Sequence, residues 1–199
     1  MKFPIVEIFS SIQGEGVNLG KPANFIRFAG CNLQCAWCDT EWKKPTEKLT
    51  REEILSRLDK KVKLVVLTGG EPLMQKELLW LVADLRTAGY TVAVETNGTY
   101  STKAIKNVGQ VHVSCSPKPQ TGYAIHPECQ FDELKYVVDD TLSCDFIVPT
   151  TSPVWLQPEG GNMQQAWKKA IEIQKQVKAA HPGMDIRVGV QLHKLMEVR

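Results

Sequence analysis

The sequence lacks an excess of charge of either sign. Its 24 lysine and arginine residues nearly balance 22 aspartate and glutamate residues, which leaves a net charge of +2 at pH 7. Nucleic acids and anionic membranes attract proteins through a concentrated basic field, so the overall charge favours neither partner. We interpret the short basic run at Lys43, Lys44 and Lys48 as a solvated face.

The sequence also has no long hydrophobic run. Its longest apolar stretches, 64–67 and 78–83, fall far short of the ~20 residues that span a bilayer. Lys2, Pro4 and Glu7 interrupt the amino terminus, which therefore does not read as a secretory signal peptide. We expect a cytoplasmic protein, in which thiols stay reduced and the six cysteines do not form three disulfides.

No internal repeat, low-complexity tract or linker divides the 199 residues. At about 150 residues per domain, this length predicts a single domain over residues 1–199. A chain of this size buries about 70% of its unfolded surface and needs no disulfide or zinc to fold.

Strand-like and helix-like segments alternate along the chain. Short apolar runs predict strands at 5–9, 24–28, 64–67, 91–95, 111–114, 134–138 and 186–191. Helices are predicted after a capping box at Thr50 and Glu53, over 75–88 before Gly89, and from Asn162 to about residue 180. The proline-rich segment 146–161 gives no regular element. This order predicts an α/β fold with a parallel sheet and right-handed crossovers, and the chain has too few units for an eight-stranded barrel. We expect a partial β/α barrel.

Three of the six cysteines are crowded into one short stretch. Cys31, Cys35 and Cys38 are spaced C-x3-C-x2-C, so their thiolates can converge on one face of a metal centre. Structural zinc usually takes four ligands from two separated pairs, and no second pair or H-x3-H follows. Iron–sulfur cubanes also normally take four cysteines, so three point to a cluster with one iron open to another ligand. A zinc site completed by a distant histidine such as His112, or three unrelated thiols, is the alternative at this point.

A glycine pair follows the apolar run at 64–67. The segment Thr68-Gly69-Gly70-Glu71-Pro72 stands at the carboxyl end of a predicted core strand, where glycine lets the backbone approach a ligand closely. A Gly-Gly pair alone usually marks a turn. Its occurrence together with the cysteine loop is a much stronger sign of a cofactor site.

The cysteine loop and the Gly-Gly-Glu-Pro segment together resemble the radical S-adenosylmethionine superfamily. In that superfamily three cysteines bind a 4Fe–4S cluster, and S-adenosylmethionine takes the fourth iron through its amino and carboxylate groups. The reduced cluster cleaves the sulfonium to a 5′-deoxyadenosyl radical, which abstracts a hydrogen from substrate. The cofactor carries the hard chemistry, and the protein supplies orientation and excludes water.

The flanking segments are similar to one family in that superfamily, the 7-carboxy-7-deazaguanine synthases. The similarity covers nearly the whole chain and includes Arg27 and the segments 11–16, 37–40, 95–98, 114–118, 157–158 and 191–194. It implies a lyase that converts 6-carboxy-5,6,7,8-tetrahydropterin to 7-carboxy-7-deazaguanine with loss of ammonia, in queuosine and 7-deazapurine biosynthesis for tRNA modification. It further implies Mg²⁺, a homodimer and an electron donor such as flavodoxin.

The resemblance also implies roles for individual residues. It implies the 4Fe–4S cluster at Cys31, Cys35 and Cys38, and Mg²⁺ at Thr40. The positions implied for S-adenosylmethionine are Trp37, Cys38, Asp39, Gly70, Glu71, Ser114, Ser116, Lys118, Gln157, Pro158, Glu159 and Gly160. The positions implied for the pterin are Ile12, Gln13, Gly14, Glu15, Arg27, Thr68, His193 and Arg199. No role is implied for Cys115, Cys129 and Cys144, which we expect to be small buried hydrophobes.

Two other functions share part of this pattern. A glycyl-radical-enzyme activase has the cysteine spacing and Gly-Gly-Glu-Pro, but not the segment 11–16 or the Asp39-Thr40 pair. A zinc-stabilised binding module without catalysis would use the cysteines alone.

Overall fold

The computed structural model describes residues 1–160 and 163–198. In these ranges nine strands form one sheet in the order β3-β1-β2-β4-β5-β6-β7-β8-β9. The strands are β1 (Phe3–Ile12), β2 (Pro22–Phe28), β3 (Glu47–Leu49), β4 (Leu64–Gly69), β5 (Thr91–Thr96), β6 (Val111–Cys115), β7 (Glu133–Val138), β8 (Val154–Pro158) and β9 (Ile186–Val188). The α-helices are α1 (Arg51–Ser56), α2 (Leu78–Thr87), α3 (Lys103–Lys106), α4 (Met163–Ala180) and α5 (Leu192–Leu195). Short 3₁₀ helices are η1 (Gly16–Asn18), η2 (Pro72–Met74), η3 (Pro119–Thr121) and η4 (Cys144–Phe146).

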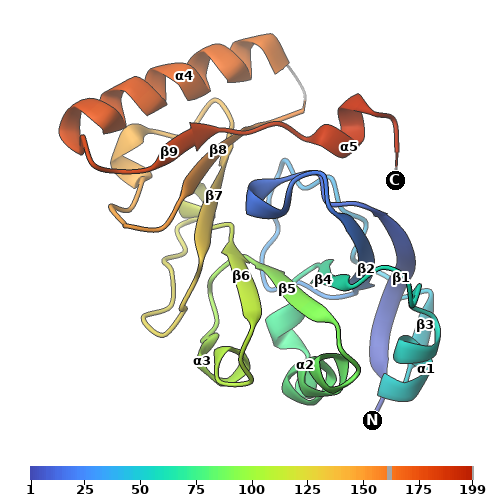
Figure 1. Ribbon diagram of the computed structural model, residues 1–199. Helices are drawn as coiled ribbons and strands as arrows, with labels where there is room; N and C mark the ends of the chain where they lie inside the picture. Colours follow the sequence, from blue (N-terminus) through green and yellow to red (C-terminus); the bar gives the residue numbers. More distant parts are fainter. Residues whose placement is uncertain (161–162, 199) are drawn as a thin grey trace.

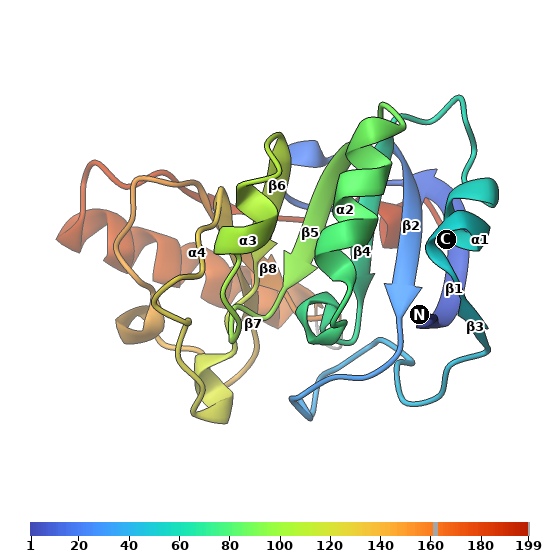
Figure 2. The same cartoon turned by 90° about the horizontal axis from the view of Figure 1, so that it is seen from below.

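Strands β2, β4, β5, β6, β7, β8 and β9 run parallel to one another and form an open arc, with α2, α3 and α4 on its outer side (Figures 1 and 2). The edges of the sheet are β3 and β9, so the barrel is partial, as expected. The start of the chain differs from the expected parallel sheet, because β1 pairs antiparallel with β2 and with β3. The connection from β1 to β2 is too short for a crossover and turns back on itself, with Gln13 N donating to Lys21 O (2.8 Å).

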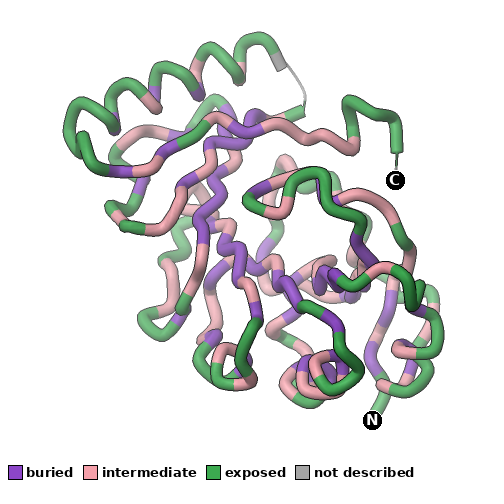
Figure 3. Tube along the Cα trace, in the orientation of Figure 1, coloured by how far each residue is buried: buried purple, intermediate pink, exposed green. Residues whose placement is uncertain are grey.

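The central strands send alternate residues to opposite faces of the sheet. Ile26, Leu67 and Val94 are fully buried in a core that includes residues of α1 and α2. A second core lies between the later strands and α4, where Leu156 packs with Ile173. Figure 3 shows this burial running along the strands, while the outer surface of α4 is exposed. The intervening residues of the strands face the concave side, where the site lies.

The two cores meet at the pairing of β6 with β7. That pairing consists of Ser114 with Glu133 and Cys115 with Leu134, whereas β5 and β6 pair over a longer stretch. Phe131 is partly buried and packs against both cores. The sheet is therefore continuous, but it has a narrow seam at this point.

Several element boundaries depart from the sequence predictions. The capping box is confirmed, since Glu53 N donates to Thr50 Oγ1 (3.2 Å) and Thr50 N to Glu53 Oε2 (2.7 Å). The helix predicted over 75–88 begins only at Leu78, because η2 precedes it and Gln75 is extended. The strand predicted over 186–191 ends at Val188, and the segment 146–161, for which no regular element was expected, contains β8.

The helix cap predicted at Asn162 lies outside the described residues. The described helices include none with the length and apolar composition to cross a bilayer.

Candidate active site

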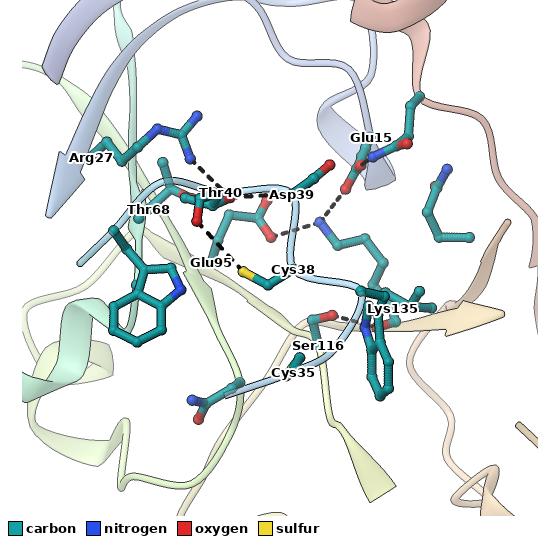
Figure 4. A pocket seen from close by; sticks show the side chains of 18 of the residues that line it. Glu15, Arg27, Cys35, Cys38, Asp39, Thr40, Thr68, Glu95, Ser116 and Lys135 are labelled. Carbon is teal, nitrogen blue, oxygen red and sulfur yellow. Dashed lines mark hydrogen bonds and ion pairs between the residues drawn. The ribbon is translucent and has the colours of Figure 1, made fainter. Parts of the chain in front are cut away.

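A cavity of about 670 Å³ opens on the concave side of the sheet. This volume falls within the ~300–1,000 Å³ typical of small-molecule sites. Its walls combine side chains from β2, β4, β5, β7 and β8 with the loop after β2 and the segment around α5. Figure 4 shows how side chains far apart in sequence meet there.

The loop after β2 carries the three cysteines, and all of them line the cavity. Cys31 and Cys35 are half-buried, and Cys38 is exposed. Leu33 N lies 3.4 Å from Cys31 Sγ and donates to it. Burial raises the pKa of the Cys31 and Cys35 thiols, so a bound metal would have to displace their protons.

Within the described residues, the three cysteine side chains are not gathered around one point. In the described part of the chain, no three His, Cys, Asp or Glu side chains are gathered so as to hold one metal ion. A cubane cluster does not need such a point, because each cysteine binds a different iron. His112, the distant histidine of the zinc alternative, does not line the cavity, and its Nε2 lies 3.2 Å from Glu133 Oε1.

The cysteine loop is fastened to the ends of β4 and β5 by hydrogen bonds. Asn97 Nδ2 donates to Asn32 Oδ1, and Asn32 Nδ2 donates to Thr99 Oγ1, both at 2.9 Å. Glu71 N donates to Gly30 O (2.8 Å). The cysteines are therefore presented by a loop whose base is fixed.

Glu71 lies behind the cavity wall and does not line it. It is fully buried, and its carboxylate accepts from Asn97 N (2.7 Å), Thr96 Oγ1 (2.8 Å) and Leu73 N (3.0 Å). Burial raises its pKa to about 6 despite these donors. Its contacts indicate that it supports the ends of β4 and β5.

Gly70 directly follows β4, lines the cavity and packs against the start of the cysteine loop. A Cβ at Gly70 would overlap the carbonyl oxygen of Gly30, stand 2.5 Å from its carbon and lie 3.1 Å from Cys31 Cβ. Only glycine fits there. Packing against the cysteine loop therefore requires glycine at position 70 whether or not a ligand binds.

Buried polar atoms without partners lie at and beside the cavity. Trp37 Nε1, Ser114 Oγ and Gln157 Oε1 have no hydrogen-bond partner among the described residues. Trp37 and Gln157 line the cavity, whereas Ser114 is buried behind it. Buried polar groups normally have partners, so Trp37 and Gln157 are suited to receive a polar ligand.

Lys118 and Ser116 line the cavity together, and Lys118 Nζ donates to Ser116 Oγ (2.5 Å). Burial lowers the pKa of the Lys118 ammonium. This pair places a cation near the cysteines, since Lys118 counteracts the rise in the pKa of Cys35.

Arg27 faces the same cavity from β2, an internal strand. Its Nε donates to Glu7 Oε1 (2.7 Å), and its Nη1 donates to Thr40 Oγ1 (3.3 Å). Thr40 Oγ1 lies 3.5 Å from Asp39 Oδ1. The guanidinium and the hydroxyl thus lie side by side at the edge of the cysteine loop (Figure 4).

A chain of charged and amide side chains, which we call the carboxylate–lysine chain, crosses the cavity wall. It comprises Gln191, Glu15, Lys135, Glu95 and Gln13. Lys135 Nζ donates to Glu15 Oε2 (2.5 Å) and Glu95 Oε2 (2.8 Å), as Figure 4 shows. Gln191 Nε2 donates to Glu15 Oε1 (2.8 Å), and Gln13 Nε2 donates to Glu95 Oε1 (3.1 Å). The chain joins four segments that are remote in sequence.

No site role was expected for Glu95, Lys135 or Gln191, although Glu95 and Gln191 lie in segments that carry the family resemblance. The signal for Lys135 was present, because it is a lysine between buried apolar residues of a predicted strand. Its partners could not be identified without the register of the sheet.

The segment around α5 closes one side of the cavity. Leu192 N donates to Gly14 O (3.0 Å), and Lys194 Nζ donates to Asp39 Oδ2 (2.7 Å). A Cβ at Gly14 would overlap Nδ1 of His193, so Gly14 makes room for His193 and does not itself line the cavity. Burial lowers the pKa of His193, which favours the neutral imidazole.

Most residues implied by the resemblance meet in this cavity. They are Ile12, Gln13, Glu15, Arg27, Cys31, Cys35, Trp37, Cys38, Asp39, Thr40, Thr68, Gly70, Ser116, Lys118, Gln157, Pro158, Glu159, Gly160 and His193. Gly14, Glu71 and Ser114 lie behind its wall, and Arg199 lies outside the described residues.

Comparison with known proteins agrees with this geometry. Residues 25–118 match the radical SAM superfamily. A 7-carboxy-7-deazaguanine synthase of Aquifex aeolicus is 36% identical over 207 residues, which cover 97% of this chain and 93% of the relative. Another, of Rhodospirillum rubrum, is 35% identical and covers 98% and 92%. The crystal structure of QueE from Escherichia coli matches with a TM-score of 0.74 and 28% identity, covering 97% of this chain and 95% of that one.

Proposed function

From the premise that this chain belongs to the 7-carboxy-7-deazaguanine synthase family of radical SAM enzymes, we propose which of its residues carry the family's reaction. The enzyme forms 7-carboxy-7-deazaguanine from 6-carboxy-5,6,7,8-tetrahydropterin with loss of ammonia. It uses a 4Fe–4S cluster and S-adenosylmethionine, and it receives electrons from a donor. The observation that carries the assignment of residues is that three cysteines, Arg27 and the carboxylate–lysine chain face one cavity.

The cluster would be held by Cys31, Cys35 and Cys38. When bound, it supplies the electron that cleaves S-adenosylmethionine and so starts hydrogen abstraction. The cysteines must lose their protons for this, and the ammonium of Lys118 nearby favours the thiolate of Cys35. The fixed base of the loop keeps the three sulfurs in place.

We assign the polar groups that have no partner to the side of the cavity that binds S-adenosylmethionine. Trp37 Nε1 would donate to the ligand, and Gln157 Oε1 would accept from it. Ser116 and Lys118 offer a hydroxyl and a cation to its carboxylate. Pro158, Glu159 and Gly160 extend this wall along the end of β8.

The opposite side of the cavity suits the pterin. Arg27 is held by Glu7 through Nε, so its terminal nitrogens are directed and can pair with the substrate carboxylate. Glu15, Gln13 and Thr68 present oxygens and an amide to the ring edge. His193 closes the site as a neutral imidazole.

Mg²⁺ would bind beside Arg27, at Thr40. Magnesium prefers oxygen ligands and keeps several waters, and the Thr40 hydroxyl next to the Asp39 carboxylate provides oxygens at the cavity edge. The ion would take its remaining ligands from substrate and water, so it should bind weakly without substrate.

We further propose that residues 1–199 form a single radical SAM domain, that the enzyme is a cytoplasmic homodimer, and that flavodoxin is its electron donor. One continuous sheet through both cores supports the single domain. Gel filtration would test the dimer, and turnover with purified flavodoxin would test the donor.

The deciding experiment is an anaerobic incubation of the reconstituted enzyme with carboxytetrahydropterin, S-adenosylmethionine and reductant, followed by mass detection. We expect 7-carboxy-7-deazaguanine from the parent and none from Cys35→Ala. Deoxyadenosine without the deazapurine would contradict the assignment and indicate another radical reaction, such as that of an activase. Absence of the visible iron–sulfur absorption after reconstitution would favour the zinc module.

A further inference from the structure

Lys135 is a buried cation to which the assignments above give no role. Its side chain is 10% exposed, and it points from β7 into the cavity. Its neighbours along the strand, Leu134 and Tyr136, are buried in the second core. A lysine in such surroundings is stable only when its charge is paired, so its partners determine what it does.

Its two partners, Glu15 and Glu95, bind Lys135 in the same way. Glu15 and Glu95 each place one carboxylate oxygen on the ammonium and the other on a glutamine amide, Gln191 or Gln13. A carboxylate has about four lone-pair sites, and each of these oxygens uses one of them in the described contacts. Both carboxylates line the cavity, so their remaining lone pairs are available to a ligand.

We propose that Lys135 is a positioning residue for the substrate: it holds Glu15 and Glu95 ionised and at one spacing, as paired acceptors for a ligand edge rich in N–H donors. The 2-amino-4-oxo edge of a pterin is such an edge. This inference rests on the proposed function and deepens it, because it states which edge of the pterin lies against β5 and β7.

The charges around the pair support this role. Burial alone would raise the pKa of Glu15, but the charge and hydrogen bond of Lys135, together with Gln191 and His193, lower it below its usual value. The two carboxylates keep the pKa of Lys135 above its usual value although burial opposes this. The other titratable groups facing this cluster are His193 from α5 and Lys118 from the turn after β6, and burial lowers the pKa of both. Lys135 is therefore the cation that compensates the two carboxylates.

Removing the cation should make stability and substrate affinity respond to pH in opposite directions. In Lys135→Met two buried carboxylates face each other, so one of them takes up a proton near neutral pH. The Tm of the variant should then rise as pH falls from 8 to 6, because the added proton relieves the repulsion. The KM for carboxytetrahydropterin should also rise over that range, since a protonated carboxyl no longer accepts from the ligand. The ratio of the variant's KM to the parent's KM should increase by up to about tenfold for each unit by which the pH falls.

The experiment measures KM, kcat and Tm of the reconstituted holoenzyme from pH 6 to 8, together with the affinity for 6-carboxypterin by fluorescence. Lys106→Met is the matched control, because it breaks the ion pair with Asp132 (2.8 Å) outside the cavity. The ratio of the KM of Lys106→Met to that of the parent should not change between pH 6 and 8. Lys135→Ala with added propylammonium should regain affinity, whereas sodium chloride at the same concentration should not restore it.

Three results would overturn the role of Lys135. They are a flat KM ratio in Lys135→Met, a KM that improves as the Tm improves, and the same pH dependence in Lys106→Met. Where Lys135→Met does not fold, Lys135→Arg provides the test: it keeps the charge but changes the spacing, so its KM should rise about equally at every pH. An unchanged KM in Lys135→Arg would refute the role. Failure of the parent to form the deazapurine would instead refute the proposed function.

Discussion

The contact between Gly70 and the cysteine loop permits a prediction worked from the structure. In Gly70→Ala the added methyl group must push away Gly30 O, which is backbone and has no rotamer to escape into. Such overpacking typically costs about 1–3 kcal/mol. Two hydrogen bonds at the junction, from Gly70 N to Phe28 O (3.0 Å) and from Glu71 N to Gly30 O (2.8 Å), would lengthen. Each contributes about 0.5–1.5 kcal/mol.

The net loss should be about 1–5 kcal/mol, because alanine offsets part of the cost by lowering the entropy of the unfolded chain, which is worth about 0.4–1 kcal/mol. For a protein of this size the Tm should fall by about 2–20 °C. Displacement of Cys31, whose Cβ lies close to the new methyl group, should lower the iron content as well.

The assay is calorimetry of the anaerobically purified protein, with iron measured on the same samples. Gly183→Ala is the matched control, because a Cβ at Gly183 meets nothing within 4 Å. It should change stability by less than about 0.5 kcal/mol. A Gly70→Ala protein with the Tm and iron content of the parent would refute the packing argument.

The remaining predictions concern single side chains. Cys31→Ala should lose the cluster, whereas Cys144→Ala should keep the iron content of the parent. Arg27→Lys keeps the charge but loses the planar guanidinium that can pair with a carboxylate through two nitrogens, so KM should rise by an amount equivalent to about 1.5–3 kcal/mol. An unchanged KM would place Arg27 outside the site. Thr40→Val should reduce the Mg²⁺-dependent part of the rate at unchanged iron content, as shown by a magnesium titration. Because burial raises the pKa of Glu71 in the folded protein from its usual value of 4.5 to about 6, its contribution to the free energy of unfolding should fall by about 2 kcal/mol as pH rises from 4.5 to above 6. Glu71→Gln should remove that part of the pH dependence in urea unfolding.

Local signals predicted much of the fold. The capping box at Thr50 and the glycine that stops α2 depend on residues adjacent in sequence, and the structure confirms both. Strand direction is not local, because alternation of apolar residues identifies a strand without its orientation. The antiparallel start could have been inferred only from the short connection between β1 and β2. Strand β8 was missed because Pro153 precedes it and Pro158 is its last residue, which obscures the burial of Val154 and Leu156 at alternate positions.

The candidate site was predictable where motifs are contiguous. The three cysteines and Gly70 are read directly from the sequence, and the structure brings them to one cavity. The carboxylate–lysine chain was not predictable in the same way, because Glu15, Glu95 and Lys135 meet only through the order and register of the strands. Glu71 belongs to a contiguous motif, but its side chain lies behind the cavity wall, where it accepts hydrogen bonds from the ends of β4 and β5.

The narrow seam between β6 and β7 has a consequence for motion in this protein. Because so few residues pair there, we expect β7, β8, β9 and α4 to open as one cooperative unit at a lower free energy than global unfolding. The cavity crosses the seam, with the cysteines on one side and Lys135 and Gln157 on the other. A bound ligand therefore fastens the two parts together, and by mass action it raises the free energy of this opening. Hydrogen exchange of the amides in β7 and β8 should slow on ligand binding, while amides of α2, far from the seam, should exchange as before.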